Sequence, residues 1–284
     1  MPTLLIEKYT GELVPFEPQI LKNSLAKSGA SENEVEAVFK KVIHRLVSGM
    51  TTREIYQIAF DELRSIRKSY AARYNLKKAL RDLGPEGYYF EAWIARLFNQ
   101  KNCQTLQGVT LQGHAVSHEI DVVAVNDNEL HLGECKFKND SNAKTPVTTP
   151  MYFLSRFNDL KNIAFEFFGK KMQPTHPWIF TNAHFSSDAI EFSEYYGINL
   201  MAWNYPPGNS IKERVDRIAL YPITCLTSLT AHQTQQLLKS GIVLVKELID
   251  NRKVFELLQV SPAIEEEILL EAQELVGITS QVSH

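Results

Sequence analysis

The apolar positions of the first 83 residues follow the pattern of a β-hairpin and then of helices. Residues 4–9 and 12–16 predict two strands, and Thr10-Gly11 predicts their turn, because glycine tolerates the positive φ of a tight hairpin. Helical spacing and capping residues then predict about four helices. They are expected at 18–28, after Ser31 with Glu34 in a capping box, after Thr51 or Thr52, and at 68–83 before Gly84-Pro85.

Between residues 84 and 205 the pattern alternates between helices and strands. The expected elements are a helix at 86–100, strands at 106–109, 118–125 and 130–138, a helix at 150–169, a strand at 177–181, a helix at 186–196 and a strand at 198–203. This order predicts a sheet covered by helices on both faces.

After Pro206-Pro207-Gly208 the pattern indicates short helices and turns. The sequence therefore predicts a multidomain α/β protein with a small α+β unit at 1–83, an α/β sheet unit at 84–205 and a small all-helical unit at 206–284.

Composition limits the class of protein. The chain has 284 residues, 44% of them hydrophobic, and a net charge of −3, which is typical of a folded protein and excludes a uniformly basic nucleic-acid coat. The three predicted units carry net charges of +4, −4 and −3. Three cysteines are too few for a disulfide framework, and neither a signal peptide nor a membrane span is evident. We expect a soluble, cytoplasmic protein with no membrane partner.

Two neighbouring strands of the second unit place acidic residues opposite each other. If Asp127-Asn128 is a two-residue loop, opposite residues have numbers that sum to 255, so Asp121 faces Glu134 and Glu119 faces Lys136. Opposed carboxylates repel, and a divalent cation such as Mg²⁺ or Mn²⁺ would resolve the repulsion. The alternative is a solvated face with a Glu119–Lys136 ion pair.

The same residues resemble a known nuclease signature. Asp121, followed after twelve residues by Glu134-Cys135-Lys136, resembles the motif of the PD-(D/E)xK nuclease superfamily, although Ile120 replaces its nominal proline. Further motifs extend the resemblance to the Mrr-like restriction endonuclease catalytic domain. They are Gly87-Tyr-Tyr-Phe-Glu91, Phe180-Thr-Asn182 and Gly197-Ile-Asn-Leu200.

This resemblance implies the roles of the site residues. Asp121 and Glu134 would hold the metal ion, with the Cys135 carbonyl as an extra ligand, and Lys136 would act beside the attacking water. Glu91 would be an accessory acid or a ligand of a second metal ion; the alternative is an acid at the rim of its helix. The Cys135 side chain alternates into the core face, so we expect a buried thiol and not a nucleophile.

The segment 64–81 contains seven basic residues and no acidic one, which suggests an anionic partner. Motifs across residues 1–83 resemble the ATP-cone, a small nucleotide-sensing domain. They are Lys8-x-x-Gly11-Glu12 with Phe16, Leu25 with Ser28-Gly29, Thr51-Thr52-x-Glu54-Ile55 and Ala71-Ala72-Arg73-Tyr74. The resemblance implies that ATP or dATP binds as an effector, with Lys8, Thr52 and Tyr56 as ligands and Lys77 or Lys78 adding charge. The usual Lys-Arg pair of this family is Lys8-Tyr9 here.

The last segment contains the pattern of Leu226, Leu229 and Gly241-Ile242, which resembles helix-hairpin-helix repeats that hold DNA backbone. Its acidic cluster Glu265–Glu267 argues against broad phosphate contact, so packing or dimerisation is an alternative role.

Together these features predict a Mg²⁺-dependent endonuclease that hydrolyses DNA phosphodiester bonds under control of ATP or dATP. We expect a homodimer, because cutting both strands with one active site per chain needs either a dimer or two successive nicks. The alternatives are a nucleotide-sensing, nucleic-acid-binding regulator with an inactive nuclease fold, and a structure-selective resolvase or RNA-directed nuclease.

Overall fold

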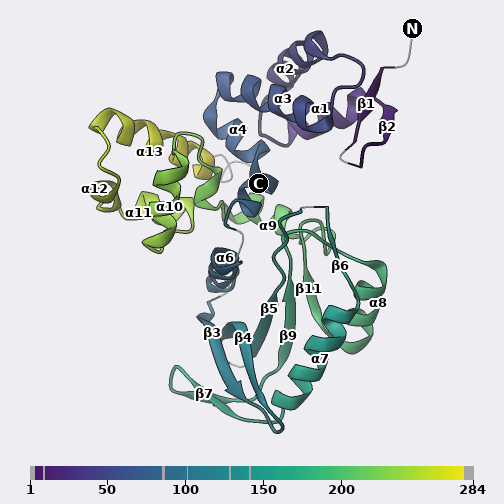
Figure 1. The fold of residues 1–284 in the computed structure, drawn as a ribbon. Helices are drawn as coiled ribbons and strands as arrows, with labels where there is room; N and C mark the ends of the chain where they lie inside the picture. The colour runs from purple at the N-terminus through teal and green to yellow at the C-terminus, as the bar shows by residue number, and fades with distance from the viewer. Residues whose placement is uncertain are drawn as a thin grey trace. The chain divides into compact units, whose positions relative to one another are not determined.

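The computed structural model describes residues 4–8, 10–84, 87–100, 102–127, 129–140 and 142–277. The expectations for Tyr9, Pro85, Glu86 and Asn128 lie outside this part of the chain. The protein is of the mixed α/β class (Figure 1). It divides into two units: one comprises residues 1–76, 225–239 and 245–284, and the other comprises 77–224 and 240–244. Each is described by itself.

The first unit begins with the predicted hairpin. Strands β1 (Leu5–Glu7) and β2 (Leu13–Pro15) pair antiparallel, and Gly11 in their turn has a φ of +81°. The helices that follow are α1 (Pro18–Ala26), α2 (Glu32–Arg45), α3 (Thr52–Ile66) and α4 (Lys68–Tyr74). Their apolar faces form one core around Leu25, Val38 and Leu63.

Two capping boxes fix where helices of this unit begin. The Ser31 hydroxyl accepts a hydrogen bond from the Glu34 amide, and the Glu34 carboxylate accepts one from the Ser31 amide. Thr51 and Glu54 make the same reciprocal bonds, so Thr51 and not Thr52 is the cap of α3. Both boxes satisfy amides that a helix start leaves without a partner.

The helix predicted at 68–83 is two helices, because α4 ends before Asn75 and α5 (Leu76–Arg81) follows. The Asn75 side chain accepts a hydrogen bond from the Tyr56 hydroxyl at 2.6 Å. The prediction of one continuous helix was wrong at this residue.

The described part of the last segment is helical, as predicted, but it contributes to both units. Helices α10 (Ala231–Lys239), α11 (Val245–Asp250), α12 (Val254–Leu258) and α13 (Pro262–Gly277) belong to the first unit. Helix α9 (Ile211–Ile218) belongs to the second unit, and the 3₁₀ turn η1 (Ile223–Cys225) spans the point where the chain passes from the second unit to the first. Buried Glu271 of α13 accepts bonds from the amides and hydroxyls of Thr227 and Ser228.

The second unit is built on a five-stranded mixed sheet of order β11-β9-β5-β4-β3 (Figure 1). The strands are β3 (Gln104–Gln112), β4 (Ser117–Val125), β5 (Leu130–Cys135), β9 (His176–Phe180) and β11 (Asn199–Met201). Strands β3, β4 and β5 run antiparallel, and β5, β9 and β11 run parallel.

Helices cover both faces of this sheet, as the sequence predicts. Phe153 of α7 (Thr148–Leu160) and Ala189 of α8 (Ser187–Tyr196) share a core with Ile179 of β9. Phe98 of α6 (Tyr88–Asn99) packs edge-on against Trp178 and Phe180, which flank Ile179 and therefore lie on the opposite face.

The helix predicted at 150–169 is shorter in the structure, because a β-hairpin occupies the last part of this range. Helix α7 ends at Leu160, and β7 (Phe165–Phe167) and β8 (Lys170–Met172) follow as an antiparallel pair. Phe168 and Gly169 both have positive φ, as a tight hairpin turn requires. The short strands β6 (Lys144–Thr145) and β10 (His184–Phe185) form a further parallel pair that the sequence did not predict.

Among the helices that the structure describes, none combines the length and the apolar character needed to cross a membrane.

Candidate active site

The predicted register of the carboxylate hairpin is confirmed. Val125 pairs with Leu130, Val123 with Leu132 and Val122 with Gly133, so each pair of numbers sums to 255. Asp121 and Glu134 come directly after the last of these pairs. The sequence thus predicted which two acidic residues the strands bring together.

The regular pairing of β4 opens at Asp121. On its other edge, β3 pairs Gln107 with Val122 and Val109 with Ile120, but Gly108, the residue opposite Asp121, has a φ of +59° and lies outside this register. Towards β5, the Asp121 Oδ2 atom accepts a hydrogen bond from the Cys135 amide at 2.6 Å. A side chain therefore takes the place of a backbone acceptor at this point of β4.

Glu91 of α6 belongs to the same group of acidic side chains. Burial, and then the negative charges of Asp121, Glu119 and Glu134, raise the pKa of Glu91 from 4.5 to about 7. Burial and the charge of Glu134 raise the pKa of Asp121 from 3.8 to about 6. The structure thus brings together the three carboxylates Glu91, Asp121 and Glu134, and their mutual repulsion opposes full ionisation.

Glu134 is buried, with 4% of its surface exposed, and is held between two cations. The Lys136 Nζ atom lies 2.5 Å from Oε1, and the Arg156 guanidinium lies 2.5 Å from Oε2. Lys136 therefore pairs with Glu134. The alternative interpretation, which expected an ion pair between Lys136 and Glu119, does not agree with this contact. A buried Glu134 also contradicts a fully solvated face.

Arg156 of α7 is a residue that the sequence reasoning missed. Its guanidinium also donates a hydrogen bond to the Glu119 carbonyl, and its side chain is 11% exposed. It lies three residues after buried Phe153 and one before buried Phe157, so it begins on the inner side of its helix. A basic residue among apolar positions at helical spacing was the one available signal.

Cys135 is of intermediate exposure, so the buried residue that alternation predicts is only partly realised. Burial, followed by the negative charge of Asp121, raises the pKa of this thiol well above its usual value, which keeps it neutral and unreactive. The Cys135 backbone amide donates its hydrogen bond to Asp121. The role of the Cys135 carbonyl as a metal ligand stays a prediction.

A second group of potential metal ligands lies near the start of β5. Glu129, His131 and His176 have ligand atoms within 4.8 Å of one another. The Nδ1 atom of His131 accepts a hydrogen bond from the Trp178 indole, so we assign the proton of the neutral ring to Nε2, 3.2 Å from Glu129. Both ring nitrogens of His131 therefore have partners within the protein, and the position of this side chain does not require a metal ion.

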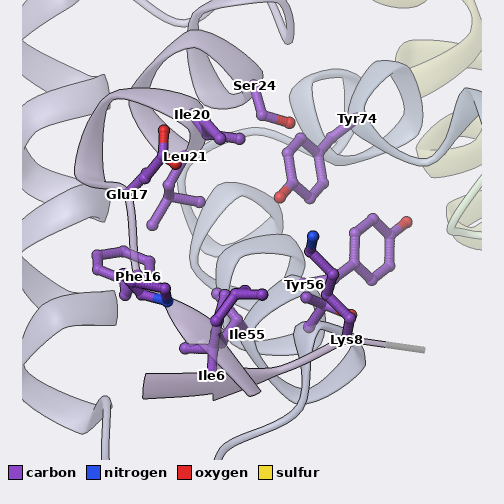
Figure 2. A pocket seen from close by; sticks show the side chains of 13 residues that line it. Ile6, Lys8, Phe16, Glu17, Ile20, Leu21, Ser24, Ile55, Tyr56 and Tyr74 are labelled. Atoms are coloured by element: carbon purple, nitrogen blue, oxygen red, sulfur yellow. The ribbon is translucent and has the colours of Figure 1, made fainter. Parts of the chain in front are cut away.

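The first unit contains a pocket of about 520 Å³ between its hairpin and helices (Figure 2). Lys8, Thr52 and Tyr56, three of the residues predicted to bind nucleotide, line it. Figure 2 shows Lys8, Tyr56 and Tyr74 along one side, with Glu17 and Leu21 across from them. The rings of Tyr56 and Tyr74 stack at 5.0 Å, and Thr52 is the first residue of α3.

Lys77 and Lys78 are placed elsewhere. Lys77 donates to Asn142 and lies 6.0 Å from the Trp203 ring centroid, and burial lowers its pKa. Lys78 pairs with Asp82 four residues on. Neither belongs to the residues that line the pocket of Figure 2.

Other members of the basic segment 64–81 have internal acceptors too. Lys68 pairs with Glu267, and the Arg73 and Arg64 guanidinium groups donate to the carbonyls of Leu275 and Thr227. These contacts provide counter-charges and acceptors that the local sequence did not contain.

Comparison with known proteins gives relatives without an assigned activity. A family described as AF1548-like, C-terminal, matches residues 221–276. An uncharacterised protein of Archaeoglobus fulgidus is 33% identical over 186 residues, which cover 65% of this chain and 100% of that protein. The crystal structure of AF1548, described as a protein of unknown function, has a TM-score of 0.54 at 31% identity and covers 67% of this chain and 98% of its own.

A more distant likeness is to Can2 from Sulfobacillus thermosulfidooxidans, solved in complex with cyclic tetra-adenylate. The identity is 13% and the TM-score 0.30, over 64% of this chain and 51% of Can2. A TM-score this low does not establish a common fold.

Proposed function

The chain belongs to the AF1548-like family, and we propose that it is a divalent-metal-dependent endonuclease that hydrolyses DNA phosphodiester bonds. The observation that carries the proposal is the convergence of Glu91, Asp121 and Glu134, from three different elements, beside Lys136. The order of α6, β3, β4, β5, α7, β9, α8 and β11 is the layout expected of an Mrr-like nuclease unit and supports it.

The donor set fits Mg²⁺ or Mn²⁺, which prefer carboxylate oxygens. Asp121 and Glu134 would hold the ion, with Glu91 as a third carboxylate and the Cys135 carbonyl as a further oxygen. Burial, and then repulsion between the carboxylates, raises the pKa values of Glu91 and Asp121, and a bound cation would offset both effects. When bound, the ion would polarise the scissile phosphate and offset its added negative charge.

Lys136 and Glu91 supply the remaining chemistry. Lys136 lies two residues after Glu134, and its partly exposed ammonium group can bind and orient the phosphate or the attacking water. A carboxyl with a pKa of about 7 exchanges its proton readily near neutral pH, which suits Glu91 to accept a proton from water.

The test is nicking of supercoiled plasmid with Mg²⁺ or Mn²⁺ by wild type, Asp121→Ala and Lys136→Ala. We expect both variants to lose on the order of 10²-fold or more in rate. Asp127→Ala, which removes an exposed carboxylate from the hairpin, is the matched control and should cleave like wild type. Equal rates for wild type and the two site variants would contradict the proposal.

Other substrates distinguish the alternatives. Tight DNA binding without cleavage under either metal ion would indicate a regulator with an inactive nuclease fold. Preference for branched DNA or for RNA over linear duplex would indicate a resolvase or an RNA-directed nuclease. Light scattering of the DNA complex tests the expected homodimer.

We further propose that ATP or dATP binds the pocket of Figure 2 as an effector. A hairpin followed by helices is the layout expected of an ATP-cone. Lys8 and the start of α3 at Thr52 suit phosphate, and the stacked rings of Tyr56 and Tyr74 suit a nucleobase. A volume of about 520 Å³ is within the range of small-molecule sites.

Calorimetry with ATP and with dATP tests this site. We expect Lys8→Ala to weaken binding on the order of tenfold by loss of one phosphate contact. Lys40→Ala, on the exposed side of α2, is the control and should bind like wild type. Absence of binding at millimolar nucleotide would remove the effector proposal.

A further inference from the structure

Arg156 contacts the candidate metal site directly. Its guanidinium pairs with Oε2 of Glu134, the carboxylate assigned above to the metal ion, and donates to the Glu119 carbonyl. The other oxygen of Glu134 pairs with Lys136. Each carboxylate oxygen therefore already has a cation beside it, and a metal ion bound directly to Glu134 has to share or displace one of these partners.

The charges of the site allow one cation to change partners. Four carboxylates, those of Glu91, Glu119, Asp121 and Glu134, oppose Lys136 and Arg156, so the fully ionised group has two surplus negative charges. A divalent ion would balance these two charges without the help of Arg156. Buried charges are stable only when they are paired, so an Arg156 released from Glu134 is expected to take a new anionic partner.

The surroundings of Arg156 leave it a way towards substrate. Its guanidinium carbon lies 5.6 Å from the ring centroid of Tyr152 and 5.9 Å from that of Phe153. Phe153 is buried, but Tyr152 is 63% exposed, so one side of the guanidinium adjoins the surface. A planar guanidinium also matches two oxygens of a phosphate better than a lysine does.

We propose that Arg156 is an exchangeable counter-ion of this site. It neutralises Glu134 in the metal-free protein, and it leaves that carboxylate for a phosphate of the bound nucleic acid when a divalent ion takes its place. This inference rests on the proposed nuclease function.

The experiment measures metal affinity and cleavage separately, in wild type, Arg156→Gln and Arg156→Lys. Mn²⁺ binding is followed by the electron paramagnetic resonance signal of free Mn²⁺, and cleavage by plasmid nicking at saturating Mn²⁺. Removing the competing charge should make Arg156→Gln bind Mn²⁺ more tightly, on the order of tenfold. The same variant should cleave more slowly, on the order of 10²-fold, because the phosphate loses its partner.

Two variants keep the result interpretable. Arg156→Lys retains the charge, so its Mn²⁺ affinity should stay near that of wild type while cleavage still falls; it also serves if Arg156→Gln does not fold. Arg217→Gln, an exposed arginine of α9 whose guanidinium contacts Asn209, is the control for loss of a positive charge and should change neither value.

The outcomes separate the two levels of the proposal. Opposite changes of affinity and rate in Arg156→Gln, or a rate loss at unchanged affinity in Arg156→Lys, support the exchange. Unchanged cleavage, or weaker Mn²⁺ binding together with slower cleavage, overturns it and leaves the nuclease proposal standing. A wild type that neither binds Mn²⁺ nor cleaves overturns the nuclease proposal itself.

Discussion

At the scale of single residues, the candidate active site is a place where the protein tolerates unfavourable electrostatics. Glu91 and Asp121 have raised pKa values because they are partly buried beside other carboxylates. Such a local conflict with stability is typical of functional sites.

The raised pKa values predict how stability depends on pH in the metal-free protein. A carboxyl whose pKa rises from 4.5 to about 7 on folding binds a proton in the folded state that the unfolded state has released. Its contribution to stability is complete below pH 4.5 and is lost as pH rises towards 7. Asp121 acts in the same direction between 3.8 and about 6.

We therefore expect the free energy of unfolding in EDTA to decline less between pH 5 and pH 8 for Glu91→Gln than for wild type. Urea unfolding at several pH values measures this. Glu191→Gln, an exposed acid of α8, is the control and should follow wild type. Parallel curves for Glu91→Gln and wild type would show that Glu91 does not titrate in this range.

At the scale of elements, the site depends on where strands stop pairing. Gly108 leaves the β3 register opposite Asp121 and has a φ of +59°, a conformation that is strained for residues with a side chain. No atom lies within 4 Å of a Cβ added there, so any penalty comes from the backbone and not from a clash.

Gly108→Ala should lower the free energy of unfolding by about 1 kcal/mol, since alanine is unfavourable in the left-handed region. Gly108→Asn should lose less, because asparagine tolerates this region better. Urea unfolding measures both, and Gly277→Ala, at a glycine without positive φ and with free space, is the control. An unchanged stability of Gly108→Ala would mean that the strand accommodates the change.

Helix α13 presents a second prediction at this scale. Its Glu271 is 2% exposed and accepts four hydrogen bonds, from the amides and hydroxyls of Thr227 and Ser228. The residues before α10 are thereby fixed to a helix more than 40 positions away in sequence.

Glu271→Ala should lower the free energy of unfolding of the protein by about 3 kcal/mol, because it leaves buried donors without an acceptor. Glu271→Gln, which keeps one carbonyl oxygen, should lose less. Chemical unfolding followed by circular dichroism measures the change, and Glu266→Ala, at an exposed position of the same helix, should be neutral. A loss below about 1 kcal/mol would contradict the role given to these bonds.

At the scale of the whole molecule, the proposed effector pocket and the proposed nuclease site belong to different units of one chain. The relative from Archaeoglobus fulgidus spans 65% of the chain, so about a third of this protein has no counterpart in it.

If the units are coupled, ATP or dATP should change the initial rate of plasmid nicking several-fold in wild type, the range expected of allosteric coupling. Lys8→Ala should abolish the response at the same nucleotide concentration, and Lys40→Ala should retain it. Nucleotide that binds in calorimetry but leaves the nicking rate unchanged would show a pocket without control over cleavage.

Much of the local structure was predictable because it depends on neighbours in sequence. Ser31 with Glu34 marks the start of a helix through bonds made within one turn. The alternation around Asp121 and Glu134 predicted their opposition once a two-residue loop was assumed, and the pairing of Val122 with Gly133, directly beside them, follows that register. The hairpin at Phe168-Gly169 was missed because its apolar residues followed directly on a helical pattern.

The sequence by itself determined most of the helices and strands, the opposition of Asp121 and Glu134, and the motifs that suggest a nuclease and a nucleotide sensor. Only the tertiary structure placed Arg156 on Glu134, Glu91 beside Asp121, and residues 225–239 and 245–277 in one unit with the N-terminal helices. The physical reason is range: helix caps and strand alternation act over a few residues. The pairing of buried charges and the satisfaction of buried donors depend on whichever groups the folded chain brings into contact.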